Sequence, residues 1–188
     1  ALHDAGLLRA WRDEQLAVRD PDGRVRGTVE RGAARALGIA THAVHLVGFS
    51  PDGCHWVQQR SLTKANDPGL WDTLMGGMVP ACDSVQQALA RETWEEAGLR
   101  LEQLQQLAHG GEVATRRPSS EAPAGYIVET ISWYRCVVPA RVEPRNLDGE
   151  VQVFERLTPA QLRGRLVGGA FTLEAALVFA AAGLANAC

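Results

Sequence analysis

Alternating apolar and polar residues mark short strands along much of the chain. Strands are predicted over residues 16–18, 25–29, 43–49, 54–59, 110–115, 126–138 and 151–154. The turn sequences DPDG at 20–23 and SPDG at 50–53 are typical of tight connections between antiparallel strands. The first four strands are therefore expected to form two hairpins.

Apolar residues at helical spacing predict the helices. These are expected near Leu7, Leu8 and Trp11, over 30–37, over 84–97, from Thr158 and Pro159 onward, and over 172–184. The turn-rich segment 116–125 is expected to be a mobile surface loop. The elements follow no regular βαβ alternation, which favours an α/β fold with a mixed β-sheet sandwiched between helices. Residues 1–38 are expected to form a small α+β extension, and residues 39–188 the main domain.

The helix predicted over 84–97 has defined ends. Asp83 or Ser84 can cap its start, because a glutamine follows each of them three residues later. Gly98 suits the left-handed conformation at its end. The helical phase of every residue between them is therefore fixed.

Carboxylates end the apolar face of this helix. At 100° per residue, the stripe that begins at Val85 continues into Glu92 and Glu96, and Glu95 lies about 60° to one side. Three carboxylates on one arc repel one another, and burying them costs free energy unless a cation or arginines neutralise them. Oxygen ligands of this kind suit Mg²⁺ or Mn²⁺ rather than zinc.

A glycine precedes the helix at a fixed distance and completes a longer motif. The stretch reads Gly77-x5-Asp83-x7-Arg91-Glu92-Thr93-x-Glu95-Glu96-x-Gly98-Leu99. It resembles the Nudix box, Gx5Ex7REUxEExGU, in which U is a bulky aliphatic residue. Asp83 replaces a glutamate of the pattern and keeps the carboxylate. Thr93 replaces an aliphatic residue, which affects packing more than chemistry.

The resemblance extends from about residue 16 to residue 180. Its sharpest motifs outside the box are RSLTKANDPGLWD at 60–72 and DGEV at 148–151. They are similar to Nudix proteins related to the module fused to thiamin pyrophosphokinase in fungi. That resemblance implies the Nudix fold and Mg²⁺-dependent hydrolysis of a small-molecule diphosphate, notably thiamin diphosphate or its damaged analogues.

The resemblance also implies metal ligands. Glu92 and Glu96 are expected to bind Mg²⁺ (or Mn²⁺) directly, and Glu95 directly or through water. The carbonyl of Gly76 is expected to add a further ligand, and Arg91 to orient the glutamates. Hydrolysis proceeds by in-line attack of water on phosphorus.

Further site residues lie outside the box. Glu150 in the DGEV motif is expected to bind metal or act as a base, with a plain turn carboxylate as the alternative. Arg60 and Lys64 are expected to bind the terminal phosphate, and Trp71 to stack on a ring of the substrate. The histidines at 42, 45, 55 and 109 show no ligand spacing and are expected to be structural.

Three other functions compete with this hypothesis. The first is hydrolysis of nucleoside diphosphate derivatives. The second is an isopentenyl diphosphate isomerase-like activity, although residues 73–77 hold no cysteine where such isomerases use one. The third is a non-catalytic Nudix-fold sensor, although such modules typically lose the glutamates that this chain keeps.

Composition narrows the classes of partner. A net charge of −3 gives no overall positive charge for binding a nucleic-acid backbone, although it leaves local basic patches open, and the longest apolar run, 175–185, is shorter than the roughly 18 residues of a membrane span. Neither a nucleic acid nor a membrane is expected as a partner. The four scattered cysteines predict reduced thiols in a cytoplasmic protein. The apolar C-terminal helix offers a surface for a homodimer or a cover within the chain. Eighteen of the 19 basic residues are arginines, and Lys64 is the exception.

Overall fold

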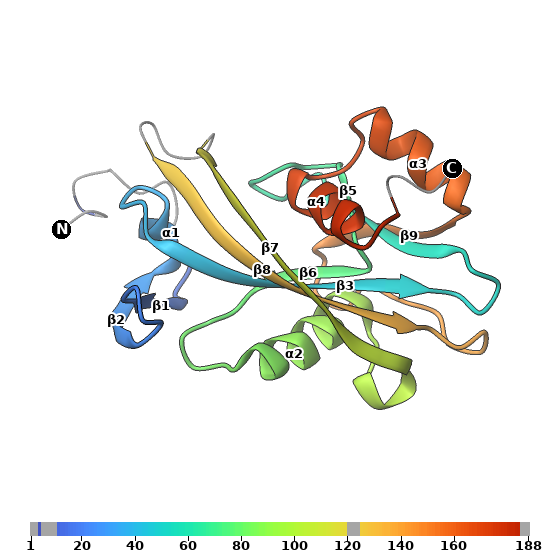
Figure 1. The fold of residues 1–188 in the computed structure, drawn as a ribbon, viewed down its shortest axis with the longest axis horizontal. Helices are drawn as coiled ribbons and strands as arrows, with labels where there is room; N and C mark the ends of the chain where they lie inside the picture. Colours follow the sequence, from blue (N-terminus) through green and yellow to red (C-terminus); the bar gives the residue numbers. More distant parts are fainter. Residues whose placement is uncertain (1–3, 5–10, 120–124, 185–188) are drawn as a thin grey trace.

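The structure is a computed structural model, and it describes residue 4, residues 11–119 and residues 125–184. The helix expected near Leu7 and Leu8 lies outside these residues. Over the described residues the chain forms a two-stranded hairpin, a larger mixed sheet and helices on both faces of that sheet (Figure 1). The predicted α/β class, with a mixed sheet between helices, is confirmed.

The N-terminal extension is a hairpin followed by a short helix. Strand β1 (Gln15–Arg19) pairs antiparallel with β2 (Val25–Glu30), and α1 (Arg31–Ala34) follows directly. Gly38 adopts a φ of +64°, which ends this segment as the sequence predicts. The helix is shorter than the predicted 30–37.

Seven strands form the larger sheet among the described residues. They are β3 (Ala40–Phe49), β4 (His55–Arg60), β5 (Trp71–Asp72), β6 (Met75–Met78), β7 (Gln105–Pro118), β8 (Tyr126–Val137) and β9 (Val151–Leu157). The order β5-β4-β3-β8-β7 forms the main path, with β6 paired to β3 and β9 to β4. Only β3 and β8 run parallel within this set, so the sheet is mixed.

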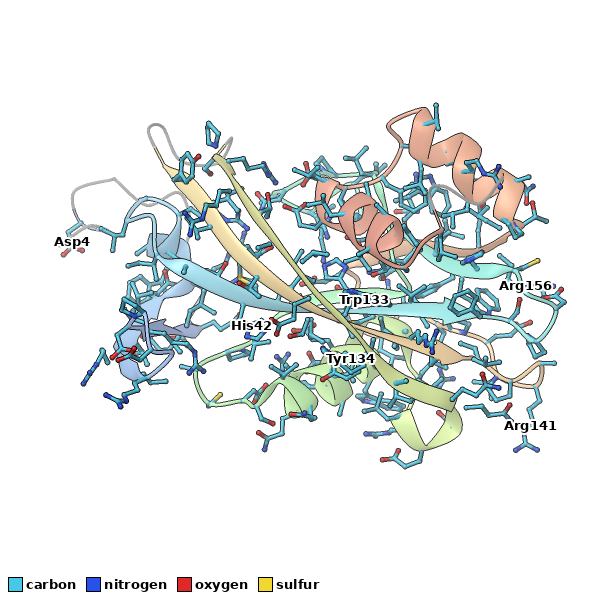
Figure 2. The ribbon with its side chains drawn as sticks, in the orientation of Figure 1. Asp4, His42, Trp133, Tyr134, Arg141 and Arg156 are labelled. Atoms are coloured by element: carbon cyan, nitrogen blue, oxygen red, sulfur yellow. The ribbon has the colours of Figure 1, made fainter. Side chains whose placement is uncertain are left out.

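Strand β7 is longer than the predicted 110–115, whereas β8 matches the predicted 126–138 to within one residue. They pair antiparallel as far as Arg116↔Val128 and Pro118↔Tyr126. Residues 116–118, expected in a mobile loop, are therefore strand. Gly110 has a structural reason in this pair, because a Cβ there would lie 2.0 Å from the indole of Trp133, the β8 residue labelled in Figure 2. Trp133 is 7% exposed and belongs to the core.

Helices cover the two faces of the sheet. Helix α2 (Val85–Ala97) packs on one face, and α3 (Pro159–Val167) and α4 (Leu173–Ala181) lie on the other (Figure 1). A short 3₁₀ turn, Leu101–Gln103, leads from α2 towards β7. Helix α4 buries Ala175, Val178 and Phe179 against the sheet, so its apolar run serves as a cover within the chain. Within the described ranges, no helix has both the length and the apolar character needed to cross a membrane.

Candidate active site

Both ends of helix α2 are fixed by the residues that the sequence indicates. The Ser84 hydroxyl accepts a hydrogen bond from the Gln87 backbone, and the Gln87 side chain accepts one from the Ser84 backbone. This is a complete capping box, so Ser84 is the cap rather than Asp83. At the other end Gly98 has a φ of +63°. The helix thereby buries Ala88 and Leu89 and directs Glu92 and Glu96 towards the sheet.

Glu96 is almost completely enclosed. Its carboxylate accepts hydrogen bonds from Gln58 Nε2 at 2.8 Å and from the backbone N–H of Gly76 at 3.1 Å. Lys64 Nζ lies 3.3 Å from its other oxygen. The side chain is only 1% exposed, and this burial raises its pKa despite the three donors. Glu96 is thus a buried, fixed carboxylate with a positive partner.

Glu92 lies against the glycine strand, which is β6 with its two glycines Gly76 and Gly77. A Cβ at Gly77 would lie 2.3 Å from the carboxylate carbon of Glu92, so only glycine leaves room for this side chain. Burial, and then the charge of Glu96, raise the pKa of Glu92 to about 7. The repulsion expected of carboxylates on one helical arc is therefore present in the folded chain.

Arg91 forms ion pairs with three carboxylates of the box. Its guanidinium lies 3.0 Å from Asp83, 3.0 Å from Glu92 and 2.9 Å from Glu95. Burial opposes its charged form, but the charge of Glu92 and the hydrogen bonds to Asp83 and Glu95 raise its pKa above the usual value. The shorter acid at position 83 thus still reaches Arg91, and Arg91 holds Glu92 and Glu95 in place.

Lys64 joins α2 to the loop before β9. Its ammonium contacts the Glu150 carboxylate as well as Glu96. Ser61 N–H donates to the Glu150 carbonyl at 2.8 Å, which holds the two loops together. Burial opposes ionisation of Glu150, but the ammonium of Lys64 lowers its pKa below the usual range. The structure therefore brings Lys64 and Glu150 to the glutamate cluster.

These groups line one polar cavity of about 280 Å³, at the small end of the range for ligand sites. Ten carboxylates and six arginine or lysine side chains line it among the described residues. The excess of acids means that an anionic substrate needs additional positive charge there. The lining includes these predicted residues: Arg60, Lys64, Gly76, Arg91, Glu92, Glu95, Glu96 and Glu150.

Two predicted substrate residues differ in their placement. Arg60 lines the cavity, where it donates to the carbonyl of Asn66 and lies 3.5 Å from Asp72. Trp71 is outside the lining: it packs against the core cluster under α3 and α4, and the guanidinium of Arg165 lies 4.3 Å from the centre of its ring. The structure therefore does not bring Trp71 to the cavity.

Several residues that line the cavity lie outside every motif of the sequence. His45 lies on the cavity wall, and its Nδ1 is 3.0 Å from the hydroxyl of Thr73. Arg117 and Glu174 form an ion pair of 2.9 Å between β7 and α4. Arg31 and Arg35 reach the cavity from the extension. All of these come from segments far from the box in sequence.

The donor types fit a hard divalent cation. Glu92 is a mostly buried carboxylate and Glu96 a fully buried one, burial raises the pKa of both, and oxygen donors of this kind suit Mg²⁺ and Mn²⁺. In the part of the chain that the structure describes, however, no three acidic, histidine or cysteine side chains are arranged as a finished metal cluster. Lys64 and Arg91 pair with these carboxylates instead.

Known proteins resemble this chain in sequence and in fold. Nudix hydrolase 20, chloroplastic, of Arabidopsis thaliana is 30% identical over 86% of this chain and 43% of its own length. An isopentenyl-diphosphate Delta-isomerase of Streptomyces griseus is 31% identical over 80% of this chain and 74% of its own. The structure of DR0079 from Deinococcus radiodurans superposes with a TM-score of 0.69 at 21% identity, covering 88% of this chain and 96% of that one.

The family assignment follows from a broader match. The chain spans about half the length of the Nudix hydrolases that it matches. The NUDIX domain itself matches residues 40–176, which include every strand of the larger sheet and helix α2. The chain belongs to the NUDIX domain family.

Proposed function

We propose that this chain is a metal-dependent hydrolase of a small organic diphosphate. The observation that carries the proposal is the position of Glu92 and Glu96, one mostly buried and one fully buried carboxylate held against the glycine strand at the cavity wall. A non-catalytic module has no need to keep such a costly arrangement. The proposal covers the reaction class first and the substrate second.

In this proposal the box glutamates hold the metal. Glu92, Glu95 and Glu96, with the Gly76 carbonyl, would bind Mg²⁺ or Mn²⁺. When bound, such a cation neutralises phosphate oxygens and lowers the pKa of a water molecule. Arg91 keeps the glutamates oriented through its ion pairs to Glu92 and Glu95.

The remaining groups act on water and phosphate. Glu150, 54% exposed at the cavity, orients or deprotonates the attacking water or adds a metal ligand. Lys64 and Arg60 bind the terminal phosphate from the loop side of the cavity. The charge that they bring offsets part of the acidic lining.

We propose thiamin diphosphate or a damaged analogue as the first substrate to test, on the strength of the motifs at 60–72 and 148–151. Nucleoside diphosphate derivatives are the alternative. An isomerase function has less support, since the described cysteines lie outside the cavity lining and residues 73–77 contain none.

A substrate panel tests the proposal. The protein is incubated with Mg²⁺ or Mn²⁺ and thiamin diphosphate, oxidised thiamin diphosphates, ADP-ribose, nucleoside di- and triphosphates or isopentenyl diphosphate, and phosphate or monophosphate release is measured. We expect release from at least one diphosphate, its loss with EDTA, and its loss in Glu96→Gln purified in parallel, which controls for contaminating phosphatases. No release from any diphosphate, or isomerisation without release, overturns the proposal.

We further propose a cytoplasmic location, which the free thiols of Cys54, Cys82 and Cys136 support. A homodimer remains a prediction as well. Because α4 uses its apolar face within the chain, a dimer would need another surface. Size-exclusion chromatography with light scattering distinguishes a monomer from a dimer.

A further inference from the structure

The N-terminal extension is attached to the wall of the cavity. The backbone N–H of Ala81, just after the glycine strand β6, donates to the Gln15 carbonyl at 2.7 Å. Leu16 is 2% exposed and packs in one cluster with Ala34 and Met78. Met78 ends β6 and itself lines the cavity. The extension therefore lies in a fixed position beside the glutamate cluster.

Helix α1 turns its basic residues towards that cavity. The Glu30 side chain caps the helix through Gly32 N–H at 2.6 Å, and Ala34 is buried below it. Arg31 and Arg35, four residues apart, both line the cavity. The extension thus supplies cations to a site whose chemistry lies in another part of the chain.

Glu14 holds both the backbone and the side chain of Arg31. Its backbone N–H donates to the Glu14 carbonyl at 2.8 Å, and its guanidinium lies 2.7 Å from the Glu14 carboxylate. The side chain is 40% exposed, and an ion pair at such exposure adds little to stability. Holding the fold together is therefore a weak explanation for this arginine.

Arg31 shares the cavity with two other cations of the predicted site. Arg31, Lys64 and Arg60 all line it together with Glu150, and Lys64 contacts the Glu150 carboxylate. Arg60 ends β4, Lys64 lies in the loop that follows, and Arg31 comes from the extension. Three cations that line one cavity from separate segments are suited to an anion with several oxygens, since a guanidinium can donate two parallel hydrogen bonds to phosphate.

We propose that Arg31 binds the diphosphate of the substrate, so that the N-terminal extension is part of the substrate site. The inference rests on the proposed function, and it adds a binding residue from outside the NUDIX match at 40–176. Arg31 binds phosphate oxygens together with Lys64 and Arg60, and Glu14 keeps its guanidinium in position.

Binding of a non-hydrolysable diphosphate tests this inference without turnover. The dissociation constant of methylenediphosphonate is measured by titration calorimetry with Mg²⁺ for the wild type, Arg31→Ala, Arg31→Lys and Arg26→Ala. Arg26 is the matched control, because it lies in the same extension, on β2, and pairs with an acid, Asp20, but is outside the cavity lining. Thermal unfolding of each variant shows whether the fold is kept.

We expect Arg31→Ala to weaken binding at least about tenfold, as loss of a charge-assisted hydrogen bond implies. Arg31→Lys should retain part of the affinity, and Arg26→Ala all of it. Wild-type affinity in Arg31→Ala overturns the inference, as do equal losses in Arg31→Ala and Arg26→Ala or no binding by the wild type at millimolar probe. If the panel shows hydrolysis but Arg31→Ala binds normally, only this inference fails. If Arg31→Ala binds weakly and no diphosphate is cleaved, the proposed reaction fails instead.

Discussion

The ammonium of Lys64 lies 3.3 Å from Glu96 Oε1 and also contacts the carboxylate of Glu150. One cation thus connects the glutamate cluster on helix α2 to the loop that precedes β9. The Lys64 side chain is 15% exposed, so its charged end occupies a narrow, mostly enclosed space between two acids. This contact gives a structural reason for the single lysine in a chain rich in arginine.

Replacing Lys64 by arginine should lower kcat/KM for the preferred diphosphate at least about tenfold. A planar guanidinium is larger than an ammonium and cannot rotate its donors freely. Steady-state kinetics of Lys64→Arg measures the effect, with Arg26→Ala as a control for changing a surface cation. Near-normal rates on every diphosphate tested would mean that arginine serves as well as lysine at position 64, so that this lysine would need no functional explanation.

Replacing Gly77 by alanine should displace Glu92, because the new Cβ would lie 2.3 Å from its carboxylate carbon. We expect a loss of about 1–3 kcal/mol in the free energy of unfolding, as for other overpacked sites, together with weaker metal binding. Gly27→Ala is the control, since nothing lies within 4 Å of a Cβ there. Denaturant unfolding that gives the same stability for Gly77→Ala and the wild type would show that Glu92 tolerates the methyl group.

Replacing Glu150 by glutamine should lower kcat about 100-fold if the carboxylate acts as a general base. The amide keeps the shape of the side chain but loses its charge and basicity. Glu143→Gln changes an exposed glutamate outside the cavity lining and should leave kcat unchanged. A kcat within twofold of the wild type would make Glu150 a turn residue that merely pairs with Lys64.

Replacing Thr93 by valine should stabilise the protein by about 1 kcal/mol. Thr93 is fully buried, and its hydroxyl has no hydrogen-bond partner among the described residues. The opposite sign is expected for Thr73→Val, because the equally buried Thr73 hydroxyl donates to the Met75 carbonyl and contacts His45. Thermal unfolding of both variants compares them. Destabilisation by Thr93→Val would mean that position 93 does not favour the aliphatic residue of the Nudix box.

Helix α2 could be predicted because its determinants are local. Its cap, its apolar stripe and Gly98 all lie within fifteen consecutive residues, and each acts through neighbours three or four positions away. Strand β6 was missed because its sequence, MGGM, has neither alternation nor β-branched residues. It exists because β3 supplies its hydrogen-bond partners from distant sequence.

The distinction between local and long-range determinants also explains which contacts of the site could be predicted from the sequence. The box glutamates and Arg91 follow from one helix, and their mutual contacts were expected. That Lys64 meets Glu150 depends on the pairing of β4 with β9, in which Arg60 lies opposite Val151. Helical spacing cannot indicate such a contact.

Two side chains show how long-range packing overrides residue type. The ring of Trp71 was expected to meet substrate, but Arg165 from helix α3 covers it. Arg31 carried no motif, yet the docking of Leu16 and Gln15 beside β6 directs it to the cavity. Arg165 lies more than 40 residues from Trp71 along the chain, and β6 lies more than 40 residues from Arg31.

Direct metal binding tests the central claim, that the carboxylates at the end of α2 hold a divalent cation for diphosphate hydrolysis. Mn²⁺ is titrated into the wild type and Glu96→Gln without substrate, and free Mn²⁺ is followed by electron paramagnetic resonance. The glutamine can still accept hydrogen bonds from Gln58 and Gly76, so the fold should persist, as circular dichroism can verify. We predict that the wild type binds Mn²⁺ and that Glu96→Gln weakens binding at least about tenfold, the lower end of the loss seen when metal-site partners are removed. Equal Mn²⁺ affinity in the two proteins would contradict the account.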